Sequence, residues 1–286
     1  MAGIHIDCIY PCSACLYCVS CHRFFPGGIG LLKVQKGNAK LDRNRVFVEE
    51  GQHINVWNLP AGHACPHAHQ CYSRANRITG KIEERITTEY RCYAASDEAR
   101  STQARNVRHE NFDLLKHRNE DEMIGLIDLS MPGGNYHRIH GSGDFFNYKY
   151  FSAWMRTALM NPNKLFYAYT KALPYWKQWL EERGSKPENF KLIASKGGTH
   201  DYLIKELGLR YCEVVFHPDE ALELGLRIDH NDEIAMFSNE DFALTLHGTQ
   251  PAGSEASKAK SRMTREQIKY SYNRKDLVYK TDLVYK

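Results

Sequence analysis

Short apolar segments alternate with helical patterns along the second half of the chain. The apolar segments are "YHRIHGSGDFF", "KLFYAYTK", "FKLIASKGG", "YCEVVFHP" and "FALTLHGTQ". Between them stand "YKYFSAWMRTAL", "PYWKQWLEER", "HDYLIKELG" and "DEALELG", whose apolar residues recur at helical spacing. Strands that alternate with helices predict an α/β fold with a parallel sheet. We expect a (β/α) full or partial TIM-type barrel, with an open doubly wound sheet as the alternative.

The region before these units contains one further strand and one long helix. "GQHINVWNLPAG" alternates as a short strand does, and residues 97–118 have the apolar spacing of a helix. Ser96 is suited to cap this helix, and the acidic side chains of Asp97 and Glu98 suit its positive N-terminal end.

Polar residues gather where the predicted strands end. They are Ser142, Gly143 and Asp144 after the first strand of the alternating region, Thr170 and Lys171 after the second, Ser195 and Lys196 after the third, His217 after the fourth, and His247 and Thr249 after the fifth. The carboxyl ends of parallel strands meet at one edge of a sheet, and ligands of α/β proteins bind there. Any one of these residues can be polar simply because its strand leaves the core. Five successive polar ends nevertheless predict a ligand site at this edge.

Composition divides the 286-residue chain into three regions. Residues 1–30 form a cysteine-rich N-terminal extension that closes with "FFPGGIG", residues 31–260 carry the barrel pattern, and residues 261–286 form a polar tail. No apolar run approaches the ~20 residues that span a bilayer, and the N-terminus lacks the pattern of a secretory signal. We therefore expect a soluble, cytoplasmic protein. The formal net charge of +4 permits an anionic substrate and does not require one.

The cysteines indicate metal or redox chemistry. Eight of the nine lie in the first 92 residues, and in a reducing compartment such a set favours metal binding over disulfides. Cys65, Cys71 and Cys92 can hold an iron–sulfur cluster with one open iron, or zinc with a histidine as the fourth ligand. The nearest candidate histidines are His63, His67 and His69. The alternative is that the three cysteines are buried free thiols.

A denser group of cysteines, "CIYPCSACLYCVSC", lies near the N-terminus and comprises Cys8, Cys12, Cys15, Cys18 and Cys21. Its first three have the C-x3-C-x2-C spacing of radical S-adenosylmethionine enzymes, and its last four are close to a ferredoxin ligand set. Ala14 stands where those enzymes have an aromatic residue, and a glycine-rich break follows. A dispensable extension or a separate metal-binding unit is an equally good interpretation.

Several long motifs resemble the phage gene product 88 family. They are "GNAKL", "NLPAGHACPHAHQCYSRANRITGKI", "YRCYAASDEAR", "RIHGSGDFFNYKYFSAWM", "LFYAYTKALPYW", "IASKGG" and "LHGTQPAGSEAS". The resemblance extends from about residue 36 to residue 260, and it implies a phage protein in an infected host cell.

A looser resemblance is to radical S-adenosylmethionine barrel enzymes, although the cysteines are spaced more widely here. It implies that Cys65, Cys71 and Cys92 hold a 4Fe–4S cluster whose open iron binds S-adenosylmethionine. A reductant protein would supply the electron that cleaves S-adenosylmethionine to a carbon radical. Gly141, Ser142, Gly143 and Asp144 would hold the cofactor's amine. Lys171, Lys196 and His247 would meet an anionic substrate, and the phage context suggests a nucleotide or nucleic-acid base.

Two alternatives remain. The chain is also similar to guanine transglycosylases, which implies base exchange on nucleic acid with a structural zinc, with Asp144 as nucleophile and Asp201 or Asp229 assisting. The other is a non-catalytic nucleic-acid-binding protein with a structural metal. Its phosphate contacts would be Arg74, Arg77, Lys81, Arg91, Arg100, Arg105 and Arg108. Acidic residues interleave with these cations, which is more typical of a solvated face.

Overall fold

The computed structural model describes residues 30–37, 41 and 53–268. The predicted cysteine-rich extension therefore lies almost wholly outside the described residues, and so does most of the predicted C-terminal tail.

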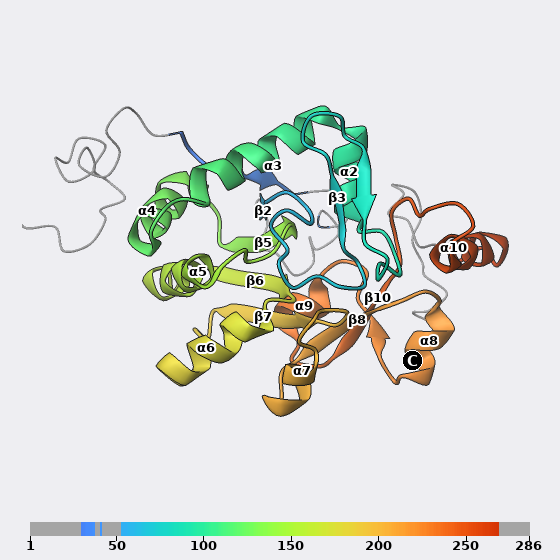
Figure 1. Ribbon diagram of the computed structural model, residues 1–286. Coiled ribbons are helices and arrows are strands. Elements are labelled where there is room, and N and C mark those ends of the chain that lie inside the picture. The colour runs from blue at the N-terminus through green and yellow to red at the C-terminus, as the bar shows by residue number, and fades with distance from the viewer. Residues whose placement is uncertain (1–29, 38–40, 42–52, 269–286) are drawn as a thin grey trace, which may run out of the picture.

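The described chain is a mixed α/β structure built on one large sheet (Figure 1). Its eight strands lie in the order β1-β2-β5-β6-β7-β8-β10-β9. β1 pairs with β2 antiparallel, and the other neighbouring strands of this sheet pair parallel. Its strands are β1 Gln35–Lys36, β2 Ile54–Asn58, β5 Tyr136–Ser142, β6 Leu165–Thr170, β7 Phe190–Ser195, β8 Tyr211–Val215, β9 Arg227–Ile228 and β10 Phe242–Thr245. The predicted parallel α/β fold is confirmed, and across the described residues the sheet is open and not closed on itself.

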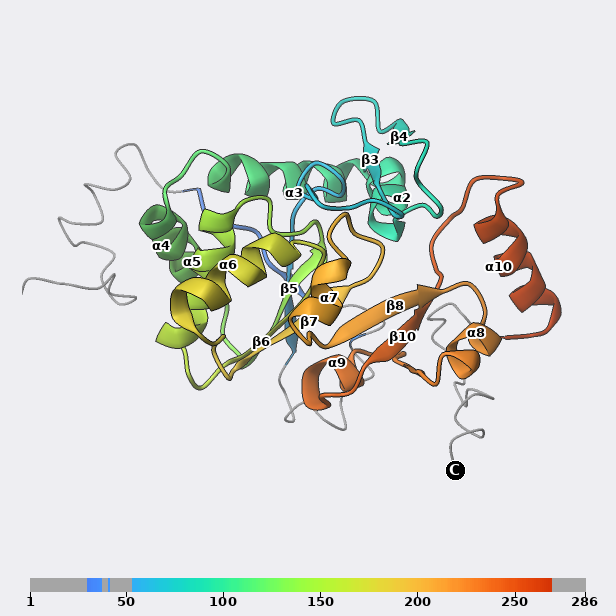
Figure 2. The same cartoon turned by 60° about the horizontal axis from the view of Figure 1, so that its bottom comes forward.

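Helices follow most of the strands, as the alternating pattern predicts. They are α2 Tyr93–Arg100, α3 Thr102–Leu115, α4 Glu120–Ser130, α5 Tyr148–Met160, α6 Leu173–Arg183, α7 Tyr202–Glu206, α8 Pro218–Glu223, α9 Glu233–Phe237 and α10 Glu255–Arg265. Figures 1 and 2 show α4, α5 and α6 side by side along one face of the sheet, with α9 on the other face. A small hairpin of β3 Ser73–Ala75 and β4 Ile82–Glu84 projects beyond the carboxyl edge of the sheet.

The single long helix predicted for residues 97–118 is wrong in detail, because the segment forms two helices. α2 ends at Arg100, and Ser101 has extended backbone angles of φ −117° and ψ 104°. The Ser101 hydroxyl accepts a hydrogen bond from the Ala104 backbone N–H at 3.1 Å and so caps α3. Ser96 is not a cap, and its hydroxyl donates to the Thr249 carbonyl at 3.1 Å.

The sheet is packed on both faces. The larger core lies between the sheet and helices α4 to α6, and its fully buried members include Trp154, Phe151, Phe166, Phe190 and Leu126. A smaller core lies on the other face, where Ile193, Tyr167 and Phe242 meet Ile234 and Met236 of α9. Because both faces are covered, the carboxyl edge is where the described sheet can present a site.

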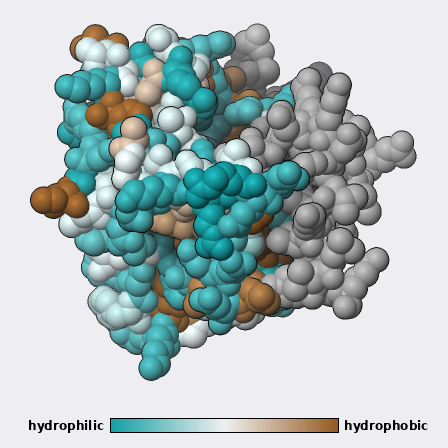
Figure 3. Space-filling model, turned by 90° about the vertical axis from the view of Figure 1, so that its right-hand side faces the viewer, coloured by the Kyte–Doolittle hydropathy of each residue, from teal (hydrophilic) through white to brown (hydrophobic). Residues whose placement is uncertain are grey.

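The surface that carries α8 and α10 is largely hydrophilic, with hydrophobic residues scattered over it (Figure 3). None of the helices in the described ranges combines the length and the hydropathy that crossing a membrane requires.

Candidate functional site

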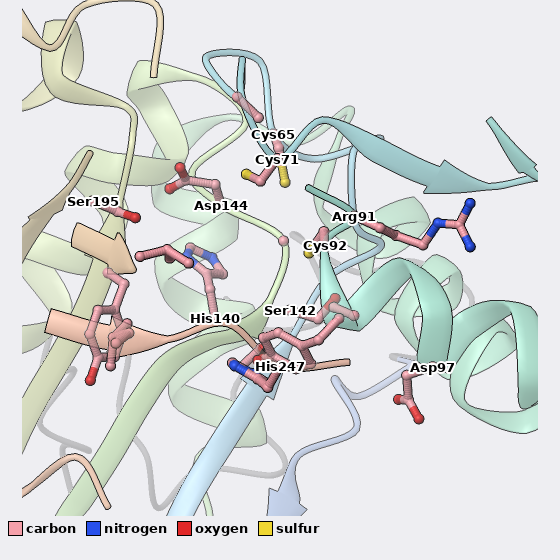
Figure 4. A pocket seen from close by; sticks show the side chains of 18 of the residues that line it. Cys65, Cys71, Arg91, Cys92, Asp97, His140, Ser142, Asp144, Ser195 and His247 are labelled. Carbon is pink, nitrogen blue, oxygen red and sulfur yellow. Dashed lines mark hydrogen bonds between the residues drawn. The ribbon is translucent and has the colours of Figure 1, made fainter. Parts of the chain in front are cut away.

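A cavity of about 630 Å³ opens at the carboxyl edge of the parallel sheet (Figure 4). Its wall comes from the loop between β2 and β3, from the start of α2, and from the ends of β5, β6, β7, β8 and β10. Three groups of predicted site residues line it together: Cys65, Cys71 and Cys92; Gly141, Ser142, Gly143 and Asp144; and Lys171 with His247. The fold therefore gathers most of the residues that the strand ends and the cysteine spacing indicated.

Backbone contacts fix the loop that carries Cys65 and Cys71. The backbone N–H groups of His69 and Gln70 both donate to the Gly197 carbonyl, at 3.2 and 3.0 Å, and Ala68 forms an isolated bridge with Gly198. These bonds attach the cysteine loop to the turn after β7, on the far side of the cavity from β2. The loop therefore lies across part of the cavity mouth.

The three thiols are free and close enough to influence one another electrostatically. Burial raises the pKa of Cys65 well above its ordinary value, and the nearby charges of Asp144 and Cys92 raise it further. Burial, with the neighbouring Cys71, raises the pKa of Cys92 to about 11. Such thiols are protonated and weakly nucleophilic at neutral pH. A cation bound among them would supply the positive charge that stabilises thiolates.

The spacing of possible ligands bears on which metal group would fit. Within the described residues, no three His, Cys, Asp or Glu side chains form a group that could hold a metal ion. Zinc needs such a compact group, since four ligands about 2.3 Å from one ion lie close together. The compact ligand set that zinc needs is therefore not assembled among the described residues.

None of the predicted histidine ligands lines the cavity. His63 Nε2 lies 3.1 Å from the Ala75 carbonyl, and the rings of His67 and His200 lie 5.0 Å apart outside the cavity lining. His69 is likewise not among the lining residues. The cavity that holds the three cysteines is therefore not lined by the histidines that the sequence offered as the fourth zinc ligand.

The turn that ends β5 depends on its glycines. A Cβ atom at Gly143, where φ is +85°, would lie 2.6 Å from Leu59 Cβ, and one at Gly141 would lie 2.4 Å from Val56 Cγ1. The Ser142 hydroxyl donates to Glu98 Oε1 at 3.2 Å, and the Tyr93 hydroxyl donates to the Gly141 carbonyl. Glycine is thus required for the backbone to pass this close to the neighbouring strand.

Asp144 is buried at the base of this turn, with 6% of its surface exposed. Its carboxylate accepts hydrogen bonds from the Phe145 N–H at 2.7 Å, the Thr170 hydroxyl at 2.7 Å and the Lys171 N–H at 2.8 Å. Burial raises the pKa of Asp144 to about 6, and the three donors oppose that rise. The carboxylate therefore joins the ends of β5 and β6 and still faces the cavity.

The two predicted lysines are held within the protein. Lys171 lines the cavity, but its ammonium donates to the Ser195 hydroxyl at 2.7 Å, the Ser195 carbonyl at 3.1 Å and the Lys196 carbonyl at 2.5 Å. Lys196 forms an ion pair with Glu213 at 2.7 Å and is not among the lining residues. These placements do not support contact between Lys196 and a bound substrate.

The carboxylates expected to assist base exchange are used elsewhere. Asp201 accepts hydrogen bonds from the backbone N–H groups of Gly197 and Gly198, at 2.7 and 2.9 Å. Asp229 accepts one from the Ala235 N–H at 2.9 Å. Neither carboxylate lines the cavity that holds Asp144, so the three do not form one site.

Most of the basic residues proposed for phosphate contact have acidic partners. The ion pairs are Arg74 with Glu83, Arg77 with Asp113, Arg91 with Glu84, Arg100 with Asp97, and Arg108 with both Asp97 and Glu98. Arg105 donates to the backbone carbonyls of Arg77 and Glu98. The ion pairs of Arg74, Arg77 and Arg100 are partly exposed and agree with the interpretation of a solvated face, whereas Arg105 and Arg108 are buried and belong to the interior of the protein.

Residues that the sequence pattern did not single out complete the cavity. Arg138 and His140 of β5 line it, with Tyr169 of β6 and Tyr93 of α2. Arg138 is held by Asp232 through a 2.5 Å ion pair. The available signal was the arginine and the two histidines of the strand "YHRIHGS", because polar and charged residues in a buried strand need a partner or a function.

The fold and the cavity define a class of α/β protein: a parallel sheet with a ligand cavity at its carboxyl edge and cysteines in the loops above it. The model of the family described as Gene product 88 matches residues 32–267, so the chain belongs to that family. This confirms the resemblance carried by the long motifs. Comparison with curated proteins and with solved structures found no match.

Proposed function

We propose that this protein is an iron–sulfur enzyme of radical S-adenosylmethionine type that modifies a nucleotide or a nucleic-acid base. The observation that carries the proposal is the meeting of three loop cysteines with the Gly141–Asp144 turn at one cavity. The cysteines follow β2 in the chain, the turn ends β5, and these two strands are parallel neighbours.

The sheet supports the finer interpretation as a partial barrel. From β2 through β5, β6 and β7 to β8, the strands adjoin one another in chain order, apart from the small hairpin of β3 and β4, and β10 then lies between β8 and β9. A chain that adds each new strand on the same side winds in one direction, as in (β/α) barrels, whereas a doubly wound sheet reverses its strand order.

In the proposed function Cys65, Cys71 and Cys92 hold a 4Fe–4S cluster. When bound, that cluster supplies one-electron reduction of S-adenosylmethionine, with electrons from an external reductant protein. The Gly141–Asp144 turn provides backbone groups and one buried carboxylate for the amine of the cofactor. The cysteine loop, attached to the turn after β7, limits the access of water to the cavity.

Support for the substrate class comes from the cavity mouth and from the family. The rings of Tyr93 and His247 lie 4.5 Å apart at the cavity wall, and Arg100, whose side chain is 69% exposed, lies on the same rim. Aromatic faces and a guanidinium are groups that bind bases and phosphates. Membership in a phage family makes a nucleotide or nucleic-acid base the natural substrate class.

The test is metal and sulfide analysis of protein purified without oxygen, together with its visible spectrum. Wild-type protein is compared with the triple variant Cys65→Ala, Cys71→Ala, Cys92→Ala. We expect the wild type to bind about four more iron atoms than the triple variant, with acid-labile sulfide and broad absorbance near ~400 nm.

Two controls make the result specific. Cys212→Ala removes a buried thiol of β8 that does not line the cavity, and it should retain the iron. A variant with alanine at all five cysteines between residues 8 and 21 tests whether iron resides in the N-terminal region. Equal iron in the wild type and the cavity triple variant, or zinc without sulfide, would refute the proposed function.

A further inference from the structure

His140 has an unusual backbone conformation at the wall of the cavity. The pairing of β2 with β5 shifts register after Trp57 and Ile139, and His140 stands in that irregularity with φ at +69°. A left-handed conformation at a residue other than glycine costs on the order of 1 kcal/mol or more, and it persists where the surrounding structure imposes it. Such residues gather at functional sites.

The imidazole of His140 is buried, with 4% of the residue exposed, and lies close to the rings of Phe145 and Tyr150. Its Nε2 is 3.3 Å from the Tyr150 hydroxyl. Its Nδ1 has no hydrogen-bond partner in the described structure. Figure 4 shows the ring beside Asp144 among the side chains that line the cavity.

The contact with Tyr150 favours one tautomer of His140. The tyrosine hydroxyl has one proton to donate, and His140 Nε2 is the acceptor that the described structure provides for it. If Nε2 accepts this bond, the ring proton resides on Nδ1. Burial lowers the pKa of His140 to about 3, so the ring remains neutral and Nδ1 carries an unused N–H donor.

We propose that His140 contacts the ligand of this cavity by donating its Nδ1–H to an acceptor atom on that ligand. The neighbouring Asp144 carboxylate serves as an acceptor, so the pair can bind a ligand that presents both a donor and an acceptor. A carboxylate oxygen, a carbonyl oxygen or a ring nitrogen satisfies His140 equally well. The inference concerns the same cavity as the proposed function and rests on it only for the choice of S-adenosylmethionine as one probe.

Two substitutions at position 140 separate hydrogen bonding from backbone strain. Asn and Gly both tolerate the left-handed conformation. His140→Asn places an amide N–H close to the position of Nδ1, whereas His140→Gly removes the donor and relieves the strain. Tyr150→Phe removes the hydroxyl that orients the imidazole and leaves position 140 unchanged.

The experiment combines histidine ¹⁵N NMR of the free protein with equilibrium dialysis of two probes, S-adenosylmethionine and guanine. The His140 signal is assigned by its loss in His140→Asn. We expect the Nδ1–H tautomer in the wild type and a mixture of tautomers in Tyr150→Phe. For the probe that binds, Kd should rise about tenfold in His140→Gly and at most about threefold in His140→Asn, as the loss of one buried hydrogen bond implies.

The outcomes distinguish this inference from the proposed function. If guanine binds in a His140-dependent way and S-adenosylmethionine does not bind, the inference stands and the proposed function fails. If S-adenosylmethionine binds equally well to the wild type and to His140→Gly, the inference is overturned and the proposed function stands. An Nε2–H tautomer in the free wild type, or no binding of either probe, also overturns the inference.

Discussion

The buried carboxyl group of Asp144 should make the protein less stable as pH rises through the range of its titration. The perturbation is Asp144→Asn, which keeps an acceptor for the Phe145 N–H and the Thr170 hydroxyl but turns an amide toward the Lys171 N–H. The substitution removes the titration and one hydrogen bond. Only the first effect depends on pH.

The sign follows from the raised pKa. Asp144 titrates at about 6 in the folded protein, against 3.8 ordinarily, because burial disfavours its charged form. The destabilisation is therefore absent below 3.8, grows as pH rises, and is complete above about 6. A pKa shift of this size lowers the free energy of unfolding by about 3 kcal/mol once Asp144 is fully ionised. About 2 kcal/mol of this loss develops between pH 4 and pH 7.

The assay is urea unfolding of metal-free wild type and Asp144→Asn at several values between pH 4 and pH 7. Other titrating groups contribute equally to both proteins, so the difference between them isolates Asp144. We expect the free energy of unfolding of the variant to rise by about 2 kcal/mol relative to that of the wild type between pH 4 and pH 7. Parallel pH profiles for the two proteins would refute the reasoning that burial outweighs the three hydrogen bonds.

Three further predictions concern the elements that shape the cavity. Gly143→Ala should lower the free energy of unfolding, measured with urea, by at least about 2 kcal/mol, because its Cβ would lie 2.6 Å from a neighbouring side chain. Gly225→Ala is the control: Gly225 has φ +67° and open space around it, so the loss should be about 1 kcal/mol. Glu98→Ala should lower the free energy of unfolding by about 3 kcal/mol, because it removes the buried carboxylate that pairs with Arg108 and accepts the Ser142 hydroxyl at the end of β5. A loss below about 1 kcal/mol would contradict this. Ser101→Ala should cost about 1 kcal/mol through loss of the α3 cap, and thermal unfolding that matches the wild type would show that the cap does not contribute.

Local patterns were enough to predict the strands and helices of the second half of the chain. The segments from "YHRIHGSGDFF" to "FALTLHGTQ" became β5, β6, β7, β8 and β10, because a strand buried on both faces and an amphipathic helix each have a short-range signature. The same reasoning failed at residues 97–118, where one serine hydroxyl bonds the backbone locally and divides the predicted helix in two.

The sequence by itself determined the fold class, the edge of the sheet that carries the cavity, and the residue types available there. Only the tertiary structure decided which of them meet. Cys65 and Cys71 line the same cavity as Cys92, and the loop after β2 that carries them pairs with the turn after β7, a contact between segments more than a hundred residues apart. Lys196 leaves the cavity because Glu213 of the next strand binds it. His140 enters the site because a shift in strand pairing turns its backbone, and such long-range packing leaves no periodic mark in the sequence.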